Sequence, residues 1–274
     1  MTTTPPSQEE RGRRFKVLHE GPCFLIPNPW DGGTARVFEA LGFEALATTS
    51  SGFAFALGRA DGQVTLDEVV EHVKVLVEAC GLPVSVDLEN GYGSAPEHAA
   101  RAIEAVATVG AVGGSIEDWE ERAGLYDVGH AAERIAAAAQ VAREQPFPFT
   151  LTARAENHIR GNPDLEDTIT RLRAYEEAGA DVLYAPGAVT RVEITSIVSA
   201  VAPRPVNVIV PRNIGLTVAD LAALGVRRIS VGGALARTAW TAFARAAQTI
   251  ADDGAFTGFD GILTGADING YFQR

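Results

Sequence analysis

The sequence predicts an α/β protein of the (β/α)8 class, a TIM-type barrel with an extended C-terminal helix. Short apolar segments alternate with longer amphipathic segments, which is typical of eight β-then-α units around a parallel sheet. Glycines end several amphipathic segments directly before the next apolar one, at Gly81, Gly110, Gly179 and Gly225. The chain has 274 residues, and eight units in this length favour closure into one barrel over an open sheet.

The expected strands are the apolar segments rich in Val, Ile, Leu and Phe: 24–27, 45–49, 84–89, 112–117, 149–153, 182–185, 206–210 and 228–231. The expected helices are 66–79, 97–108, 131–143, 165–177, 193–200, 218–224 and the longer 234–251. Thr65, Thr190 and Thr217 are in position to cap the helices that follow them.

A single domain is expected over residues 1–274. Its N-terminal segment, 1–20, contains a helix expected over 8–19 that closes the bottom of the barrel. The C-terminal part, 234–274, consists of the long helix and a short Gly-containing tail, and tails of this kind often lie on another subunit.

The composition excludes several classes of partner. The net charge of -12 leaves no electrostatic footprint for nucleic acid or an anionic membrane. No apolar segment is long enough to span a bilayer, and residues 1–20 lack the apolar core of a signal peptide. Cys23 and Cys80 form no CxxC pair and no zinc-type spacing. We therefore expect a cytoplasmic protein that binds neither nucleic acid nor membrane.

The strongest chemical signal is the segment 84–89. Side chains alternate along a strand, so Ser85, Asp87 and Glu89 share one face and point into the barrel mouth. Two carboxylates on one buried face repel each other, and a divalent cation would relieve that repulsion. Oxygen ligands without His or Cys indicate Mg²⁺, or Mn²⁺, rather than zinc. The alternative is that one acid pairs with an arginine and the other is solvated.

Neighbouring strand ends add to this cluster. Glu117 ends the next strand on the same face, and Arg154 is the one cation expected to emerge near these acids. The Arg154 guanidinium suits a bidentate grip on a substrate carboxylate, or else a salt bridge to Glu117 or Glu156.

Two further loops can contribute to binding. The loop at Ser50, Ser51 and Gly52 offers hydroxyls and backbone N–H groups for a carboxylate or an enolate oxygen. Trp30 follows the first strand, where it walls the pocket or caps the core.

Absent motifs narrow the chemistry. The sequence has no GxxxxGKS loop and no GxGxxG after a strand, which speaks against nucleotide binding. Its two lysines, Lys16 and Lys74, are not at expected strand ends, which speaks against Schiff-base chemistry. No histidine cluster lies at a strand end.

These strand ends resemble the phosphoenolpyruvate mutase/isocitrate lyase superfamily over residues 24–256. The resemblance is carried by Asn28-Pro29-Trp30-Asp31, Thr48-Thr49-Ser50-Ser51-Gly52, Ala56-Leu57-Gly58-Arg59-Ala60-Asp61-Gly62, Val86-Asp87-Leu88-Glu89-Asn90-Gly91-Tyr92-Gly93, Ser115-Ile116-Glu117-Asp118 and Thr152-Ala153-Arg154.

The resemblance implies a Mg²⁺-dependent barrel that cleaves or forms C–C or C–P bonds next to a 2-oxo acid or its enolate. It implies that Asp87 contacts the metal, while Asp61, Glu89 and Glu117 hold its waters. It also implies that Arg154 and the segment 50–52, with Asp87 and Trp30 nearby, bind the small 2-oxo acid or carboxylate substrate. Family members often form tetramers that exchange the last helix, so a homo-oligomer, dimer or tetramer, is expected.

The loop 119–127 departs from the family. It lacks the Cys and His of the lyases, and the Lys and Asn of the mutase.

Catalytic roles are expected for Arg154, Glu117 and Tyr126, with Glu121 and Arg122 as further proton sources. Three functions remain open. The first is a carbon–carbon lyase similar to isocitrate or methylisocitrate lyase, or an oxaloacetate decarboxylase. The second is a C–P enzyme, similar to the mutase or to phosphonopyruvate hydrolase. The third is a 2-oxo acid binding protein with little activity.

Overall fold

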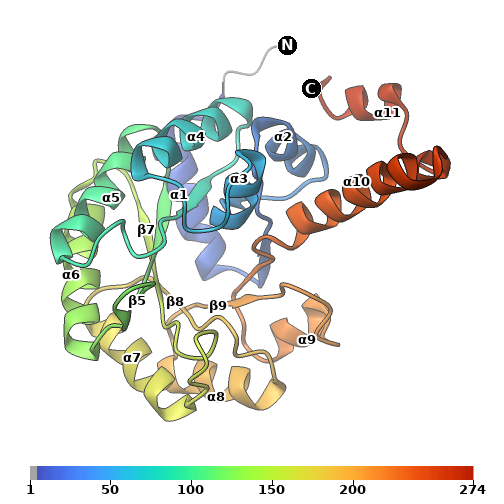
Figure 1. Ribbon diagram of the computed structural model, residues 1–274. Helices are drawn as coiled ribbons and strands as arrows, with labels where there is room; N and C mark the ends of the chain where they lie inside the picture. The colour runs from blue at the N-terminus through green and yellow to red at the C-terminus, as the bar shows by residue number, and fades with distance from the viewer. Residues whose placement is uncertain (1–4, 274) are drawn as a thin grey trace.

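The computed structural model describes residues 5–273 and confirms the predicted barrel (Figure 1). One parallel sheet has the order β1-β10-β9-β8-β7-β4-β3-β2. Its strands are β1 Phe24–Ile26, β2 Leu46–Ala47, β3 Val84–Asp87, β4 Gly113–Glu117, β7 Thr150–Arg154, β8 Val182–Tyr184, β9 Val206–Ile209 and β10 Arg228–Ser230. Each lies within a segment where the sequence predicts a strand, with β7 one residue longer at its C-terminal end.

The expected helices are present, and most of them surround the sheet (Figure 1). They are α1 Gln8–Glu20, α4 Leu66–Ala79, α5 Pro96–Thr108, α6 Val128–Glu144, α7 Leu165–Glu177, α8 Arg191–Val201, α9 Val218–Ala223 and α10 Ala234–Asp253. Thr65, Thr190 and Thr217 cap α4, α8 and α9, each in a reciprocal capping box, as predicted.

Several short elements differ from the prediction. Helices α2 Gly32–Ala40 and α3 Ser50–Ala56 begin at Gly- and Ser-rich segments that favour loops, but Asp31 and Thr49 cap them. The loop after β4 forms an antiparallel hairpin of β5 Trp119–Glu120 and β6 Gly124–Leu125. The tail contains the 3-10 helix Thr257–Phe259 and α11 Gly265–Gly270.

The third strand is shorter than predicted, which changes the position of Glu89. Strand β3 ends at Asp87, and Glu89 adopts a left-handed backbone with φ of 48°. Gly91 continues this turn at φ 79°, and a Cβ there would lie 2.8 Å from the Ala99 backbone. The strand alternation therefore holds for Ser85 and Asp87 but stops before Glu89.

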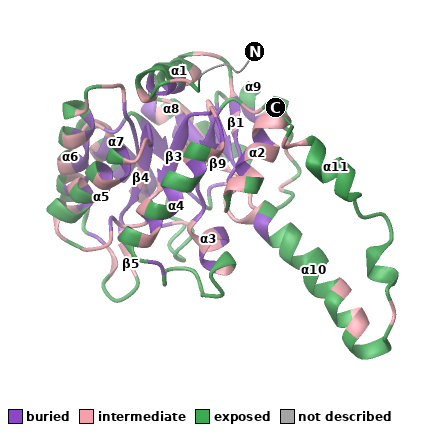
Figure 2. Cartoon of the chain, turned by 90° about the horizontal axis from the view of Figure 1, so that it is seen from above, coloured by how far each residue is buried: buried purple, intermediate pink, exposed green. Residues whose placement is uncertain are grey.

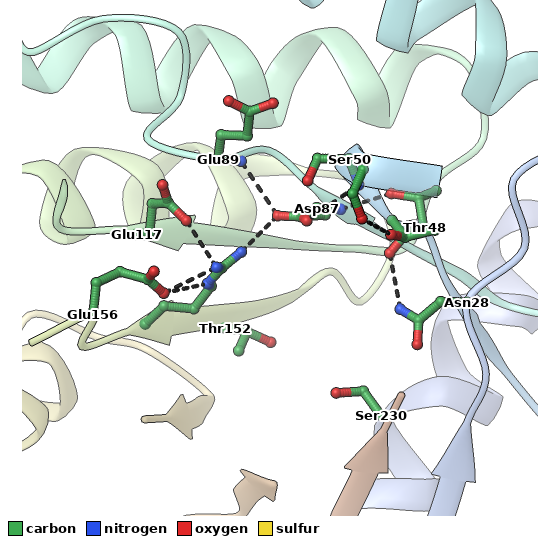
Figure 3. Close-up of polar contacts among 12 residues, drawn as sticks. Asn28, Thr48, Ser50, Asp87, Glu89, Glu117, Thr152, Glu156 and Ser230 are labelled. Atoms are coloured by element: carbon green, nitrogen blue, oxygen red, sulfur yellow. Dashed lines mark hydrogen bonds and ion pairs between the residues drawn. The ribbon is translucent and has the colours of Figure 1, made fainter. Parts of the chain in front are cut away.

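Asn28 closes the barrel at the seam between β1 and β2. These strands lie at the two ends of the sheet order and form no regular ladder with each other among residues 5–273. Its side-chain amide donates to the Thr48 carbonyl at 2.9 Å (Figure 3). Its carbonyl oxygen accepts from the backbone N–H groups of Val231 and Gly232 at 3.0 and 2.8 Å. One buried side chain thus joins the ends of β1, β2 and β10.

The apolar core lies mainly between the buried strands and the outer helices (Figure 2), whereas polar side chains line the barrel interior near the carboxyl ends of the strands. Helix α1 closes the opposite end through buried Phe15, which packs with Phe24, Ile26, Ala45 and Val112. The predicted role of residues 8–19 at the bottom of the barrel is therefore confirmed. No helix among residues 5–273 is long and apolar enough to cross a membrane.

Helix α10 projects away from the barrel, with the tail folded back along it (Figures 1 and 2). Of its residues only Ala236 is buried. Exposed apolar side chains of this projection include Leu235, Trp240, Phe243, Phe256 and Phe259.

Replacing Asn28 with Ala should lower the free energy of unfolding by about 3 kcal/mol, because three backbone groups near the barrel seam lose their partner. Urea unfolding followed by circular dichroism measures this change. Asn269→Ala on exposed α11 is the matched control and should change stability by less than about 0.5 kcal/mol. Equal midpoints for the two variants would show that Asn28 does not close the barrel.

Candidate active site

A cavity of about 240 Å³ lies at the carboxyl ends of the strands, where β/α barrels carry their active sites. Polar side chains from all eight strands or the loops after them line it, among them Asn28, Thr48, Ser50, Asp61, Asp87, Ser115, Arg154, Tyr184, Asn207, Arg228 and Ser230. A larger cavity of about 380 Å³ lies at the opposite end, lined by Lys16, His19 and Asp181. Its position at the amino ends of the strands makes it the weaker candidate.

Arg154 is the centre of an ion-pair cluster at the cavity wall (Figure 3). Its guanidinium lies 2.7 Å from Asp87, 2.8 Å from Glu117 and 2.9 Å from Glu156. Glu117 and Arg154 are register partners on adjacent strands β4 and β7, so the sheet itself sets their contact. The sequence allows a salt bridge from Arg154 to Glu117 or Glu156 as the alternative to substrate binding. Arg154 forms salt bridges with both acids and with Asp87.

Burial makes this cluster electrostatically strong. Burial lowers the pKa of Arg154, but Glu156, Glu117 and Asp87 outweigh it and hold that pKa well above its ordinary value. Burial raises the pKa of Glu117 well above its ordinary value, with the Arg154 charge opposing the rise. Arg160 adds a second cation, 3.7 Å from Glu117 and stacked on the Trp119 ring of the hairpin.

Asp87 is further fixed by two neighbouring backbone N–H groups and a hydroxyl. Its backbone N–H donates to the Thr48 hydroxyl at 2.8 Å. Its carboxylate accepts long hydrogen bonds of 3.4 Å from the backbone N–H groups of Ser50 and Glu89. Ser50 is the first residue of α3, so Asp87 faces the start of the segment that the sequence predicts to bind substrate.

The predicted metal-site carboxylates are only partly brought together. Asp61 and Asp87 line the cavity, and Glu117 reaches the cluster through Arg154. Glu89 follows the left-handed turn, and its carboxylate points away from Asp87 and Arg154 (Figure 3). Among residues 5–273 no three His, Cys, Asp or Glu side chains converge on one metal position.

The donor set nevertheless fits a hydrated Mg²⁺ ion, which needs only one or two carboxylates and keeps several waters. Burial raises the pKa of Asp61, which shares the cavity wall with Asp87. One buried carboxylate oxygen of Glu89 has no hydrogen-bond partner among the described residues. Burial, followed by the charges of Asp87 and Asp61, raises the pKa of Glu89 to about 7. A cation beside Asp87 would lower the cost of ionising all three acids.

The other predicted site residues divide into two groups. Ser50 and Ser51 line the cavity, whereas Gly52 is buried inside α3 against Thr49 and Trp30. Trp30 itself does not line the cavity, and its carbonyl accepts a hydrogen bond from His72.

Tyr126 also lies off the cavity wall. Its hydroxyl donates to Glu120 at 3.0 Å and accepts from the Asn90 amide at 3.1 Å. Glu121 and Arg122 are exposed at the turn of the hairpin.

Sequence reasoning missed the polar residues on the far side of the barrel. Asn207, Arg228 and Ser230 line the cavity from β9 and β10, and Tyr184 lines it from β8. The alternation that identified Asp87 also marks Arg228 and Ser230, which flank Ile229 in the same way. The same signal therefore exists in the sequence of the last strand.

The sequence profile described as phosphoenolpyruvate phosphomutase matches residues 15–251. The chain belongs to this family. An uncharacterised Mycobacterium tuberculosis protein is 35% identical over 240 residues, covering 85% of this chain and 87% of that protein. An oxaloacetate decarboxylase of Bradyrhizobium diazoefficiens is 31% identical, covering 69% and 68% of the two chains.

Solved structures of the phosphoenolpyruvate mutase/isocitrate lyase superfamily agree with this assignment. A Burkholderia cenocepacia protein classed only provisionally as a lyase/mutase is 51% identical with a TM-score of 0.93, covering 97% of both chains. A 2,3-dimethylmalate lyase is 26% identical with a TM-score of 0.84, covering 95% and 94%. Members of this superfamily are lyases or mutases, and the present chain is an enzyme of it.

Glu89→Gln should change how stability depends on pH in a metal-free buffer containing EDTA. The folded-state pKa of Glu89, about 7, exceeds its ordinary 4.5, so the wild-type protein loses stability as pH rises from 4.5 to 7. Gln cannot ionise, and the variant should be more stable than wild type by roughly 2 kcal/mol at pH 8 and similar near pH 4.5. Denaturant unfolding across this range tests it, with exposed Glu71→Gln as control. Parallel wild-type and variant profiles would contradict the raised pKa.

Proposed function

We propose that the protein is a Mg²⁺-dependent carbon–carbon lyase that cleaves the bond next to a 2-oxo acid through an enolate. The observation that carries this proposal is the fixed pairing of Arg154 with Asp87 on the wall of a small polar cavity. An arginine and a carboxylate in contact there can bind, respectively, a substrate carboxylate and a metal ion. The oxaloacetate decarboxylase and 2-methylisocitrate lyase relatives support a substrate of this class.

Each residue has a separate task in this proposal. Asp87 and Asp61 would hold the hydrated ion, and Glu89 and Glu117 would add negative charge near it. When bound, Mg²⁺ acts as a Lewis acid toward the 2-oxo group. Arg154 orients the substrate carboxylate, since Glu117 and Glu156 fix its guanidinium from behind. Ser50 and Ser51 present hydroxyl and N–H groups to the oxygen that gains negative charge.

The hairpin 119–125 is the proposed source of the proton. Its Trp119 ring is held by Arg160, which itself contacts the ion-pair cluster. Glu121 and Arg122 at its exposed turn would reach the substrate only after the hairpin closes over the cavity. The C–P alternative has less support because this hairpin contains no lysine.

Asp87→Asn should lower kcat/KM at least about 100-fold and weaken Mg²⁺ binding, because a metal ligand becomes neutral. The test is a Mg²⁺-supplemented panel of oxaloacetate, isocitrate, methylisocitrate, dimethylmalate and phosphonopyruvate, combined with Mg²⁺ titration calorimetry. Exposed Asp67→Asn on α4 is the control and should behave as wild type.

Unchanged turnover and metal affinity in Asp87→Asn would refute the metal role. Release of phosphate from phosphonopyruvate as the main reaction would favour the C–P enzyme. Binding without turnover of any of the five acids would favour a binding protein.

We further infer that the protein forms a homo-oligomer in which α10 and the tail pack on another copy of the chain. Trp240 and Phe243 contact each other on this projecting helix, yet they are 41% and 63% exposed. A projecting helix with a row of exposed aromatic side chains is costly in water and typical of an interface.

Replacing Trp240 and Phe243 together with Ser should therefore dissociate the oligomer toward monomers. Light scattering coupled to gel filtration measures the mass of each form. Val192→Ser, which removes an even more exposed apolar side chain from α8, should leave the mass unchanged. A monomeric wild-type protein at micromolar concentration would rule out the oligomer.

A further inference from the structure

The cavity contains a second buried arginine whose surroundings are the opposite of those of Arg154. Arg228 on β10 is 5% exposed and lines the cavity floor. Its guanidinium donates to the Asn207 side-chain carbonyl at 2.9 Å and to the Thr152 hydroxyl at 2.9 Å. Over residues 5–273, no carboxylate lies within ion-pair distance of it. Its positive charge is therefore held in place but not neutralised.

The third partner of Arg228 is also uncharged. His19 of α1 lies 3.4 Å from the guanidinium through its Nε2 atom, and its Nδ1 atom lies 2.8 Å from the Phe15 carbonyl. A carbonyl only accepts, so Nδ1 carries the proton and Nε2 accepts from Arg228. Burial, with Arg228 adding to it, lowers the pKa of His19 to about 3, which keeps the ring neutral. Burial likewise lowers the pKa of Arg228 to about 10, so the guanidinium stays charged at neutral pH.

A buried charge with only neutral partners is unfavourable, and most proteins pair such groups with an opposite charge. Here the uncompensated cation faces a cavity that a ligand can enter. Asp61 and Asp87, the acids that line the cavity, lie on its β2–β3 side. The β9–β10 side is formed by neutral groups and cations: Asn207, Arg228, Ser230, Gly232, Gly233 and Arg237.

The two arginines are connected through the sheet. Successive register partners on β8 and β9 lead from Arg154 on β7 to Arg228 on β10, so both side chains enter the same barrel interior. Arg154 thus lies beside the proposed metal ligands at one end of the cavity. Arg228 lies at the other end and has no anionic partner among residues 5–273.

We propose that Arg228 binds a second carboxylate of the substrate and makes the enzyme selective for 2-oxo dicarboxylates over 2-oxo monocarboxylates. This inference rests on the proposed function, because Arg154 and the metal site are taken to hold the 2-oxo acid end. A monocarboxylate such as pyruvate fills that end alone and leaves the Arg228 charge uncompensated. A dicarboxylate neutralises both ends of the cavity.

Titration calorimetry in the presence of Mg²⁺ tests this with two ligands, pyruvate and the stable 2-oxo dicarboxylate 3,3-difluorooxaloacetate. Wild-type protein should bind the dicarboxylate more tightly. Arg228→Gln should weaken the dicarboxylate at least about 10-fold and change pyruvate less than about 2-fold, because one charged hydrogen-bonded contact is lost. Arg227→Gln removes the same charge from the preceding residue, which does not line the cavity, and should leave both affinities unchanged.

Equal weakening of both ligands in Arg228→Gln, with thermal unfolding unchanged, would assign Arg228 a positioning role and overturn the inference. If Arg228→Gln does not fold, Arg228→Lys provides the decision. The quantity to compare is the affinity for the dicarboxylate divided by the affinity for pyruvate. Lysine lacks the planar guanidinium fork, so a ratio at least about 3-fold below that of wild type supports selectivity. An unchanged ratio overturns it. Wild-type protein that binds both ligands equally defeats this inference alone, whereas wild-type protein that binds neither defeats the proposed function.

Discussion

The contact of Arg154 with three carboxylates is the constraint on which the site depends. Asp87, Glu117 and Glu156 come from the ends of three neighbouring strands or the residues just after them, and without a central cation they would repel each other. Breaking one member of such a buried cluster leaves an uncompensated charge, so its members fix one another. The guanidinium therefore helps to fix Asp87, and with it the wall of the cavity.

The cluster also connects parts of the chain that are distant in sequence. Arg160 extends it to the Trp119 ring, which attaches the hairpin to the strand ends. On the other side, the Ser50 N–H attaches α3 to Asp87. The proposed metal ligands, the proposed proton source and the substrate-binding segment therefore share one electrostatic framework. Arg228 stands outside it, with neutral partners only, and this contrast divides the cavity into two ends.

The sequence predicted the barrel well because hydrophobic alternation and helix caps are local signals. It also identified Asp87, Glu117 and Arg154, since alternation in a strand determines which side chains enter the barrel. Glu89 was placed on the same face, but the left-handed turn ends the strand two residues earlier, and backbone turns of this kind carry little sequence signal at a non-glycine residue. Tyr126 was expected in the site because of its loop, whereas its partners Glu120 and Asn90 hold it outside the cavity. Contacts between distant segments of this kind cannot be read from spacing.

The polar interior of the barrel has a consequence for how this fold diversifies. Apolar side chains pack mainly in the ring between the sheet and the helices. Substitutions there change the packing density and lower the stability of the fold. Asn207, Ser230 and Arg228 are not part of that apolar ring, because their side chains line the cavity. Because these inner side chains are hydrogen-bonded to one another, selection can change them as a group while the apolar ring keeps its shape. An architecture built this way allows one scaffold to carry either lyase or mutase chemistry.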